Sequence, residues 1–426
     1  MIRAALLLFA ALFLAAPSPE QTATLIRGAH VFDGTGSAAL VRDVLIRGDR
    51  IASIGRHIRI PRDARVIDAK GLTLLPGLHD LHIHTRSQAF ATPQTLTEGY
   101  APYLAAGVTS INEYSVGRDM LAGIRAMVAG GAQTPHLQLA LRMGVPHGHG
   151  TESDFTNSIT AQVTTPAEAR AAIAPIIAYR PDVIKVFTDG WRYGRDADRP
   201  SMDLPTLSAI VEEARRADIP VVTHTVTLGG AKIAARAGVD AVVHGVGDAL
   251  VDRELIRLMK RKHVAYVPTL VVYEPQQDRA FLPQEWPLLN AQARTREETR
   301  KTAPPLPIPP YESRRWDIMQ QNVRLLKAAG VRIGVGTDAG IGGVYHGFAT
   351  LREIRWLVRL GFTPAEALKA ATSESARIIG KDRLQGRIAR GRRADLVLIG
   401  GRPDRRIEDI YDVRHVFVDG REVGFD

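Results

Sequence analysis

Both ends of the chain carry short runs in which hydrophobic and polar residues alternate. Between residues 24 and 73 such runs flank a Gly-Asp pair at 48–49, and their β-branched alternation predicts antiparallel strands. The C-terminal stretch has the same alternation of hydrophobic and polar residues, and an Asp-Gly pair at 419–420 predicts a hairpin. We therefore expect one small β-sandwich domain built from residues 22–73 and 381–426.

Apolar runs of strand length recur through the middle of the chain, separated by helix-like segments. This alternation is typical of βα units, whose strands are parallel. Eight runs are candidates for these strands: Leu74–His82, Val108–Glu113, Leu137–Leu141, Val183–Phe187, Pro220–His224, Ala241–His244, Val264–Pro268 and Arg332–Thr337. A (β/α)8 barrel has eight strands, so the sequence predicts an α/β fold with a TIM barrel over residues 74–380.

Two helices and one long connection can be predicted in more detail. The helices are 202–217, with Ser201 as the N-cap, and 363–379, with Pro364 in the first turn. The connection Val271–Tyr311 contains a proline-rich stretch that excludes regular helix and inner strand. Because it follows a strand end, we interpret it as a lid on the substrate side; a plain surface excursion is the alternative.

The first residues have the order of a secretory signal. Arg3 is the only early charge, Ala4–Ala16 is apolar throughout, and small and polar residues follow. The apolar run is short for a bilayer span, so residues 1–21 predict a signal peptide, with an uncleaved anchor as the alternative. The chain has no cysteine, which is compatible with an oxidising compartment. We expect a periplasmic or secreted protein without stable membrane insertion after signal cleavage.

The formal net charge of +10 raises the question of nucleic-acid binding. The arginines are scattered along the sequence, without a basic amphipathic helix or a repeated aromatic platform. We interpret the charge as general surface character and expect no nucleic-acid partner. With 426 residues, 45% hydrophobic and 23% charged, the composition is that of a globular enzyme with one large and one small domain.

Six potential metal ligands stand at or near the ends of predicted barrel strands. His82 and His84 alternate along one strand end and so project from one face. The candidates at the ends of other strand-like runs are Lys185, His224, His244 and Asp338. In a barrel of parallel strands these ends meet at one mouth.

Lys185 is unusual because lysine is sparse in this arginine-rich chain and this one lies within an apolar run. Burial disfavours the charged ammonium, which lowers the pKa and exposes a nucleophilic neutral amine. The alternative is an ordinary pairing of the lysine with a buried carboxylate.

Several segments together resemble the amidohydrolase superfamily. They are the Pro-Gly-Leu-His-Asp-Leu-His-Ile-His run at 76–84, the lysine of 184–187, the two later histidines, and Gly-Thr-Asp-Ala at 336–339. The Thr-Pro-Ala-Glu-Ala-Leu run at 363–368 and the segment 391–397 are similar to the imidazolonepropionase-related branch, which includes secreted metal-dependent Xaa-Pro dipeptidases and carboxypeptidases. The resemblance covers nearly all of the chain after the expected signal.

The resemblance implies a binuclear centre of two divalent metal ions at the barrel mouth. The ligands it implies are His82, His84 and Asp338 for one ion, His224 and His244 for the other, and Lys185, carboxylated by carbon dioxide, as the bridge. Imidazole and carboxylate donors without thiolate suit Zn²⁺ best, with manganese, cobalt or iron also compatible. Ring oligomers are common in the resembled branch, so a homo-oligomer is compatible with it.

This ligand set implies hydrolysis of an amide C–N bond. Two ions favour a bridging hydroxide near neutral pH and polarise the substrate carbonyl, which the hydroxide attacks. Asp338 is the expected catalytic residue, which accepts the proton of the hydroxide and delivers it to the leaving amine. The expected substrates are dipeptides, N-acyl amino acids or similar small molecules.

Three other functions stay open. An imidazolonepropionase-like cyclic amidase shares the fold but uses one ion in the cytosol, so Lys185 and the signal count against it. The same site could serve a lactone or ester hydrolase, because hydroxide attacks an activated ester more easily than an amide and needs less catalytic assistance. A catalytically silent binding protein would lack a ligand, and none of the six is missing.

Substrate-binding candidates lie at the same mouth. The glycine-rich loop after the third predicted strand contains His147 and His149, and we favour His149 as a hydrogen-bonding group. The others are His346 after the last strand, Tyr114 and Tyr266 at strand ends, and Arg142 and Arg192, which suit a substrate carboxylate. For each of them, packing or solvation is the alternative.

Overall fold

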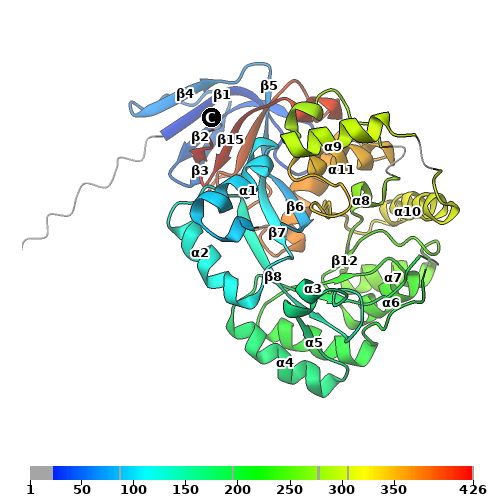
Figure 1. Ribbon diagram of the computed structural model, residues 1–426. Coiled ribbons are helices and arrows are strands. Elements are labelled where there is room, and N and C mark those ends of the chain that lie inside the picture. The colour runs from blue at the N-terminus through cyan, green and yellow to red at the C-terminus, as the bar shows by residue number, and fades with distance from the viewer. Residues whose placement is uncertain (1–22, 86–87, 194–195, 276–278, 305–306, 425–426) are drawn as a thin grey trace, which may run out of the picture.

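The computed structural model describes residues 23–85, 88–193, 196–275, 279–304 and 307–424 (Figure 1). The expected signal peptide, residues 1–21, lies outside this part of the chain. Among the described residues, no helix combines the length and the apolar composition that crossing a bilayer requires.

One mixed sheet combines the two ends of the chain. Its strands are β1 (Ala23–Val31), β2 (Leu40–Arg47), β3 (Arg50–Gly55), β4 (Ala64–Asp68), β5 (Leu72–Pro76), β14 (Leu396–Gly400), β15 (Val413–Val418) and β16 (Arg421–Glu422). Their order is β16-β15-β14-β5-β1-β2-β3, with β4 beside β1, and Figure 1 shows the blue N-terminal strands next to β15 in red. Ile26, Val44, Leu398 and Phe417 lie in the buried core of this sheet. The small β-domain expected from both termini is confirmed.

The strand expected at Leu74–His82 is in fact two strands. The first half belongs to β5 in the terminal sheet, and the second half is β6 (Leu78–Ile83), the first strand of the barrel. The chain passes between the two sheets at Gly77, whose N–H donates to the carbonyl of Asp395 at 2.8 Å. The hydrophobic pattern hides this break because the residues on both sides of it are buried.

A second sheet of parallel strands forms the barrel. Besides β6 it contains β7 (Val108–Glu113), β8 (His136–Gly144), β10 (Val183–Phe187), β11 (Val221–His224), β12 (Ala241–Val243) and β13 (Ala265–Val267), and β9 (Thr160–Gln162) pairs with β8. Neighbouring strands follow one another in chain order, which is the arrangement that repeated βα units produce. Six of these strands therefore lie where the alternating pattern predicts them.

Residues 332–339, the closing segment, complete the barrel between β13 and β6. The segment makes isolated parallel bridges to both neighbours rather than a continuous ladder. The N–H of Leu81 also donates to the carbonyl of Val335 at 2.8 Å. The eighth predicted strand thus has its expected position, and the predicted α/β barrel is confirmed.

Helices cover the outside of the barrel (Figure 1). The α-helices are α1 (Pro93–Ala105), α2 (Leu121–Ala129), α3 (Asp154–Ser158), α4 (Pro166–Ala178), α5 (Leu204–Arg216), α6 (Leu228–Ala237), α7 (Arg253–Lys262), α8 (Leu270–Tyr273), α9 (Ala291–Thr302), α10 (Pro310–Ala328), α11 (Phe348–Arg359), α12 (Pro364–Lys369) and α13 (Ser375–Ile378). Single 3₁₀ turns are η1 (Gln88–Phe90), η2 (Arg118–Met120), η3 (Trp286–Leu288) and η5 (Ile407–Tyr411).

Two of the detailed helix predictions need correction. The N-cap of α5 is Asp203, whose carboxylate accepts the N–H of Thr206, and not Ser201, because the helix begins two residues later than expected. The helix expected at 363–379 passes through a π-helical turn at Ala370–Glu374 between α12 and α13.

The long connection Val271–Tyr311 contains regular structure. It includes α9, and α10 begins at Pro310, a position where the missing N–H has no helical partner to lose. Arg352 of α11 holds the connection with two buried ion pairs, to Glu274 at 2.8 Å and to Glu285 at 3.0 Å. The role of this connection as a lid stays a prediction.

Gly77→Ala will destabilise the fold, because a Cβ at this position would lie 1.9 Å from Oγ1 and 2.8 Å from Cβ of Thr109. We expect the free energy of unfolding to fall by about 1–3 kcal/mol, measured as a lower urea midpoint. The control is Gly123→Ala inside α2, where nothing lies within 4 Å of the added Cβ and stability will rise by up to about 1 kcal/mol. Equal midpoints for the two variants would contradict this packing.

Candidate metal centre

The six potential ligands come from five neighbouring segments at the C-terminal mouth of the barrel. His82 is in β6 and His84 follows it, while the other four lie in or directly after β10, β11, β12 and the closing segment. Five of the six are buried, and His84 is partly exposed. The parallel strands thus bring together residues up to 256 positions apart in the chain, the spacing of His82 from Asp338.

Asp338 contacts both histidines of the first barrel strand. Its Oδ1 lies 3.3 Å from Nε2 of His82 and 3.0 Å from Nε2 of His84, and these two nitrogens are 3.2 Å apart. One atom each from His82, Asp338 and His244 also forms a group whose members all lie within 4.8 Å of one another. Imidazole and carboxylate donors at this spacing suit one divalent cation.

His224 and His244 form the other half of the site, with ring centroids 4.4 Å apart. Nδ1 of His244 lies 2.9 Å from Oγ1 of Thr269, and Nδ1 of His84 lies 2.9 Å from Oγ of Ser115. Such contacts fix the orientation of an imidazole and leave Nε2 as the ligand atom.

Lys185 lies among these potential ligands, and its amine has no hydrogen-bond partner in the described part of the chain. The side chain is 2% exposed, and Nζ lies 4.9 Å from the centre of the Tyr114 ring, which stacks on His82 at 4.4 Å. Burial lowers the pKa of Lys185 well below its usual value, and the charge of Asp338 opposes this only in part. A buried amine without a partner is unfavourable, so this position fits a group that the protein chain itself does not supply.

The protonation states of the ligands fit cation binding. Burial lowers the pKa of His82, His224 and His244 well below the ordinary value, so these imidazoles are neutral. Burial alone would raise the pKa of Asp338, but its contacts with His82 and His84 hold it well below its usual range. Neutral imidazoles and an ionised carboxylate are the forms that bind a metal.

A left-handed backbone occurs at two of the potential ligands and at the residue that contacts one of them. The angle φ is 84° at His244, 60° at Asp338 and 47° at Thr269. Residues other than glycine keep this conformation only where their surroundings fix it, and such positions cluster at functional sites. Glu353 supplies one such constraint, because its carboxylate accepts the N–H of Leu270 at 2.8 Å and that of the next residue at 2.9 Å.

Sequence reasoning missed two carboxylates beside the ligands. Oδ2 of Asp189 lies 3.7 Å from Nε2 of His224, and this residue follows β10 in a Thr-Asp pair like that at 337–338, which was a usable signal. Asp80 accepts hydrogen bonds from the N–H of Thr337 at 3.1 Å and from its hydroxyl at 2.7 Å. No local pattern reveals this second contact, since its partners are 257 residues apart.

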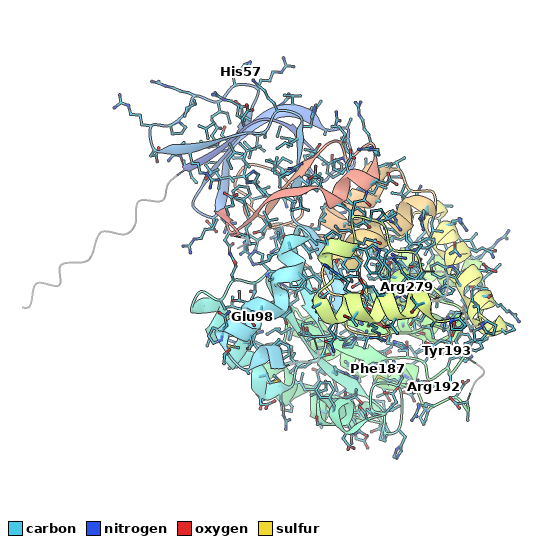
Figure 2. The ribbon with its side chains drawn as sticks, turned by 45° about the horizontal axis from the view of Figure 1, so that its top comes forward. His57, Glu98, Phe187, Arg192, Tyr193 and Arg279 are labelled. Atoms are coloured by element: carbon cyan, nitrogen blue, oxygen red, sulfur yellow. The ribbon has the colours of Figure 1, made fainter. Side chains whose placement is uncertain are left out.

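His149 lies beside the second half of the site. Its ring centroid is 3.9 Å from that of His224, and its Nδ1 is 2.6 Å from Oε1 of Glu152. Arg192, labelled in Figure 2, pairs with the same glutamate at 2.7 Å. The structure therefore brings His149 to the ligands and engages Arg192 in an ion pair.

The remaining substrate candidates have other surroundings. Nδ1 of His346 lies 2.7 Å from the hydroxyl of Tyr103, and burial lowers the pKa of this histidine to about 4. Tyr266 packs in the barrel core, where its hydroxyl accepts the N–H of Val246 at 2.8 Å. Arg142 is buried and donates to a carbonyl of the glycine-rich loop at 2.7 Å.

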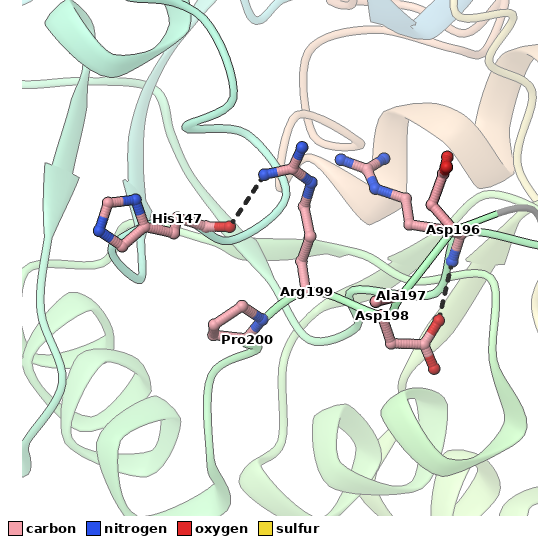
Figure 3. Close-up of a pocket in the computed structure, with 7 residues that line it drawn as sticks. His147, Asp196, Ala197, Asp198, Arg199 and Pro200 are labelled. Atoms are coloured by element: carbon pink, nitrogen blue, oxygen red, sulfur yellow. Dashed lines mark hydrogen bonds between the residues drawn. The ribbon is translucent and has the colours of Figure 1, made fainter.

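His147 lines a cavity of about 570 Å³ together with Arg192, Asp198 and Arg199 (Figure 3). Its carbonyl accepts a hydrogen bond from Arg199 at 3.3 Å, and its ring points away from that guanidinium. None of the six potential ligands lines this cavity, so the two histidines of the glycine-rich loop face different environments.

A family model described as "Amidohydrolase family" matches residues 73–423. The chain belongs to the amidohydrolase family. The resemblance drawn from the sequence motifs is therefore confirmed.

Individual relatives share parts of this chain. The N-acyl-D-aspartate deacylase of Alcaligenes xylosoxydans xylosoxydans is 28% identical over 200 residues, 47% of this chain and 36% of the relative. Ochratoxinase of Aspergillus niger is 30% identical over 251 residues, 57% of this chain and 45% of the relative. The matches thus span less than half the length of each of these two relatives. A Bifidobacterium longum protein assigned as a prolidase has a solved structure that superposes over 95% of both chains, with a TM-score of 0.77 and 26% identity.

Glu353→Gln will change how the stability of this amidohydrolase depends on pH. Burial raises the pKa of Glu353 to about 8 from the ordinary 4.5, against the hydrogen bonds from Leu270 and Val271 that lower it. The folded state therefore keeps a proton that the unfolded chain releases, and the stability present below pH 4.5 is lost as the pH rises through about 8. The variant lacks this loss, so its stability relative to wild type will rise across the window by up to about 1.4 kcal/mol per pH unit.

Urea midpoints at three pH values within that window measure this effect. Glu98→Gln, an exposed glutamate on α1 (Figure 2), is the control and will follow the wild-type curve. If the Glu353→Gln curve also ran parallel to the wild type, Glu353 would be ionised in the folded state and the assignment would be wrong.

Proposed function

We propose that this amidohydrolase is an extracytoplasmic enzyme that cleaves the amide bond of dipeptides or N-acyl amino acids at a binuclear metal centre. The observation that carries the proposal is the buried amine of Lys185, which has no hydrogen-bond partner among the described residues. This amine is close enough to Asp338 and to His82 to interact with them electrostatically. Carboxylation turns such an amine into an anion with two oxygens, which two cations can share.

The donor set supports this assignment. In the proposed centre the ligands are His82, His84 and Asp338 for one ion, His224 and His244 for the other, and carboxylated Lys185 for both. All are nitrogen or oxygen donors, which suit Zn²⁺ and are also compatible with manganese, cobalt or iron. When bound, such cations supply Lewis acidity, which favours deprotonation of water near neutral pH and polarises a carbonyl oxygen.

Asp338 is the proposed proton carrier. Although burial opposes ionisation, the contacts with His82 and His84 keep its pKa well below the usual range, so Oδ1 is a carboxylate oxygen at neutral pH. A carboxylate in that state accepts a proton from the attacking water and releases it to the leaving amine, which cannot depart without one. The left-handed backbone of Asp338 aims this side chain at the two histidines.

His149 is the proposed partner of the substrate carbonyl. Glu152 holds its Nδ1 at 2.6 Å, and the ring lies against His224 at the edge of the centre. This arrangement leaves Nε2 for the substrate. Because Nδ1–H is donated to Glu152, Nε2 carries an N–H only in the imidazolium form of His149, and in that form it can hydrogen-bond the carbonyl oxygen as negative charge develops on it. The relatives named for N-acyl-D-aspartate and for a prolidase support an amide bond next to an amino acid as the bond that is cleaved.

The extracytoplasmic location rests on residues 1–21 alone, whose order of charge, apolar run and small residues is that of a signal. N-terminal sequencing of the protein recovered from periplasmic and cytoplasmic fractions tests it. We expect a shortened chain in the periplasmic fraction. A chain that retains Met1 and stays in the cytoplasmic fraction would contradict export.

Lys185→Ala will remove the bridge between the two halves of the centre. We expect about two metal ions per wild-type chain by plasma emission, loss of at least one in the variant, and a fall of about 100-fold or more in hydrolysis of a dipeptide and N-acyl amino acid panel. Intact-mass measurement of the wild type will show the added mass of one carbon dioxide, absent from the variant.

The matched control is Lys70→Ala, which removes an exposed lysine from the terminal sheet and will leave metal content and activity unchanged. One ion or none in the wild type, with activity indifferent to Lys185, would reject the binuclear mechanism. The preferred assignment would then be a mononuclear cyclic amidase or a binding protein.

A further inference from the structure

Arg315, on α10, lies between two aromatic rings near the barrel mouth. The carbon at the centre of its guanidinium is 4.7 Å from the centre of the Tyr193 ring and 5.1 Å from that of Tyr273. Tyr193 follows β10, and Tyr273 ends α8, so the two rings come from the connections after separate barrel strands. Guanidinium groups bind well to aromatic faces, which fix the group in place without using its N–H donors.

One aromatic ring separates this guanidinium from the candidate metal centre. The ring of Tyr273 meets that of His244 edge-on, with centroids 6.0 Å apart. Arg315 is therefore separated from the proposed ligand His244 by the ring of Tyr273 alone.

Two glycines directly after the ligand His244 allow this placement. A Cβ at Gly247 would lie 2.6 Å from Cγ of Arg315, and a Cβ at Gly245 would lie 2.8 Å from Cγ of Met319. The absence of side chains at these two positions lets α10 pack directly against the loop that carries the ligand. The aliphatic stem of Arg315 is therefore fixed relative to the centre.

The guanidinium of Arg315 contacts aromatic rings but has no anionic partner among the described residues. Among the described residues no carboxylate forms an ion pair with it, and its buried Nε has no hydrogen-bond partner. The other arginines near the mouth are engaged, since Arg192 pairs with Glu152 at 2.7 Å and Arg142 donates to the carbonyl of Gly150 at 2.7 Å. A partly buried guanidinium with open donors, held beside a catalytic centre, is suited to an anionic group of the substrate.

We propose that Arg315 binds the free carboxylate of the amino acid that leaves, so that the enzyme selects substrates with a carboxylate next to the scissile amide. This rests on the proposed function. The guanidinium pairs with the carboxylate through two parallel N–H donors, while the tyrosine rings on either side exclude water from the pair.

The test compares a carboxylate with its neutral isostere. The probes are N-acetylmethionine and its carboxamide, each as both enantiomers, assayed with wild type, Arg315→Met, Arg315→Lys and Arg314→Met. We expect wild type to prefer the acid, and Arg315→Met to raise KM for the acid by about 10- to 100-fold with little change for the carboxamide. Arg315→Lys keeps the positive charge but loses the two parallel N–H donors of the guanidinium, so it will keep only part of the affinity for the acid.

Arg314→Met is the matched control, because it removes the exposed arginine next in sequence on the same helix and will leave both KM values unchanged. If Arg315 only holds the two tyrosine rings in place, Arg315→Met will raise KM for the acid and for the carboxamide by the same factor and will lower the melting temperature. That result overturns the proposal, as does a wild type without preference for the acid.

A binding measurement separates this proposal from the proposed function. Calorimetric titration of wild type and Arg315→Met with the same probes reads the preference for the carboxylate without turnover. If wild type hydrolyses none of the probes but binds the acid more tightly than the carboxamide through Arg315, the hydrolase assignment fails and the carboxylate site stands. If wild type binds neither probe, the carboxylate site is rejected.

Discussion

The contact between β6 and the closing segment completes the barrel, and the candidate metal centre depends on it. Asp80 secures this contact, because its buried carboxylate accepts the N–H of His82 on its own strand, the N–H and hydroxyl of Thr337 on the closing segment, and the hydroxyl of Thr350 on α11. The closing segment makes only isolated bridges to its neighbours, so these bonds replace part of a continuous ladder. Asp338 follows Thr337 directly, and the same carboxylate therefore fixes the spacing of two proposed ligands.

A second layer of support stabilises backbone that would otherwise relax. His244 and Thr269 both have positive φ values at neighbouring strand ends, and the hydroxyl of Thr269 lies 2.9 Å from Nδ1 of His244. Glu353 holds the turn after Thr269 by accepting two consecutive N–H groups. The strain at the mouth is thus balanced by hydrogen bonds from α11, a helix that contributes no ligand.

The arginines of this basic chain have distinct roles according to what faces them. Arg352 is buried between Glu274 and Glu285 and ties the long connection to the barrel, which is a structural role. Arg315 meets aromatic rings instead of carboxylates, and its charge stays available at the mouth. The barrel provides the frame, and the chemistry depends on which side chains the loops and helices add at its rim.

Much of this architecture follows from local sequence patterns. Apolar runs define the strands, and parallel strands linked by helices bring their C-terminal ends to one mouth, so the six potential ligands could be grouped before any coordinates were known. The burial of Lys185 follows from its apolar run in the same way. The break at Gly77 does not, because buried residues on both sides of it belong to different sheets and look alike in the pattern.

The tertiary structure alone decided which groups surround the ligands. Asp80 and Glu353 act on partners that are distant in the sequence, and Arg315 reaches the mouth only because two glycines let α10 pack against the loop after β12. Hydrophobic periodicity records which face of an element is buried, but it carries no information about which distant side chain meets that face. The sequence by itself therefore determined the barrel, the terminal sheet and the grouping of the six potential ligands at one mouth. Packing between elements decided the supporting carboxylates and the position of the Arg315 guanidinium.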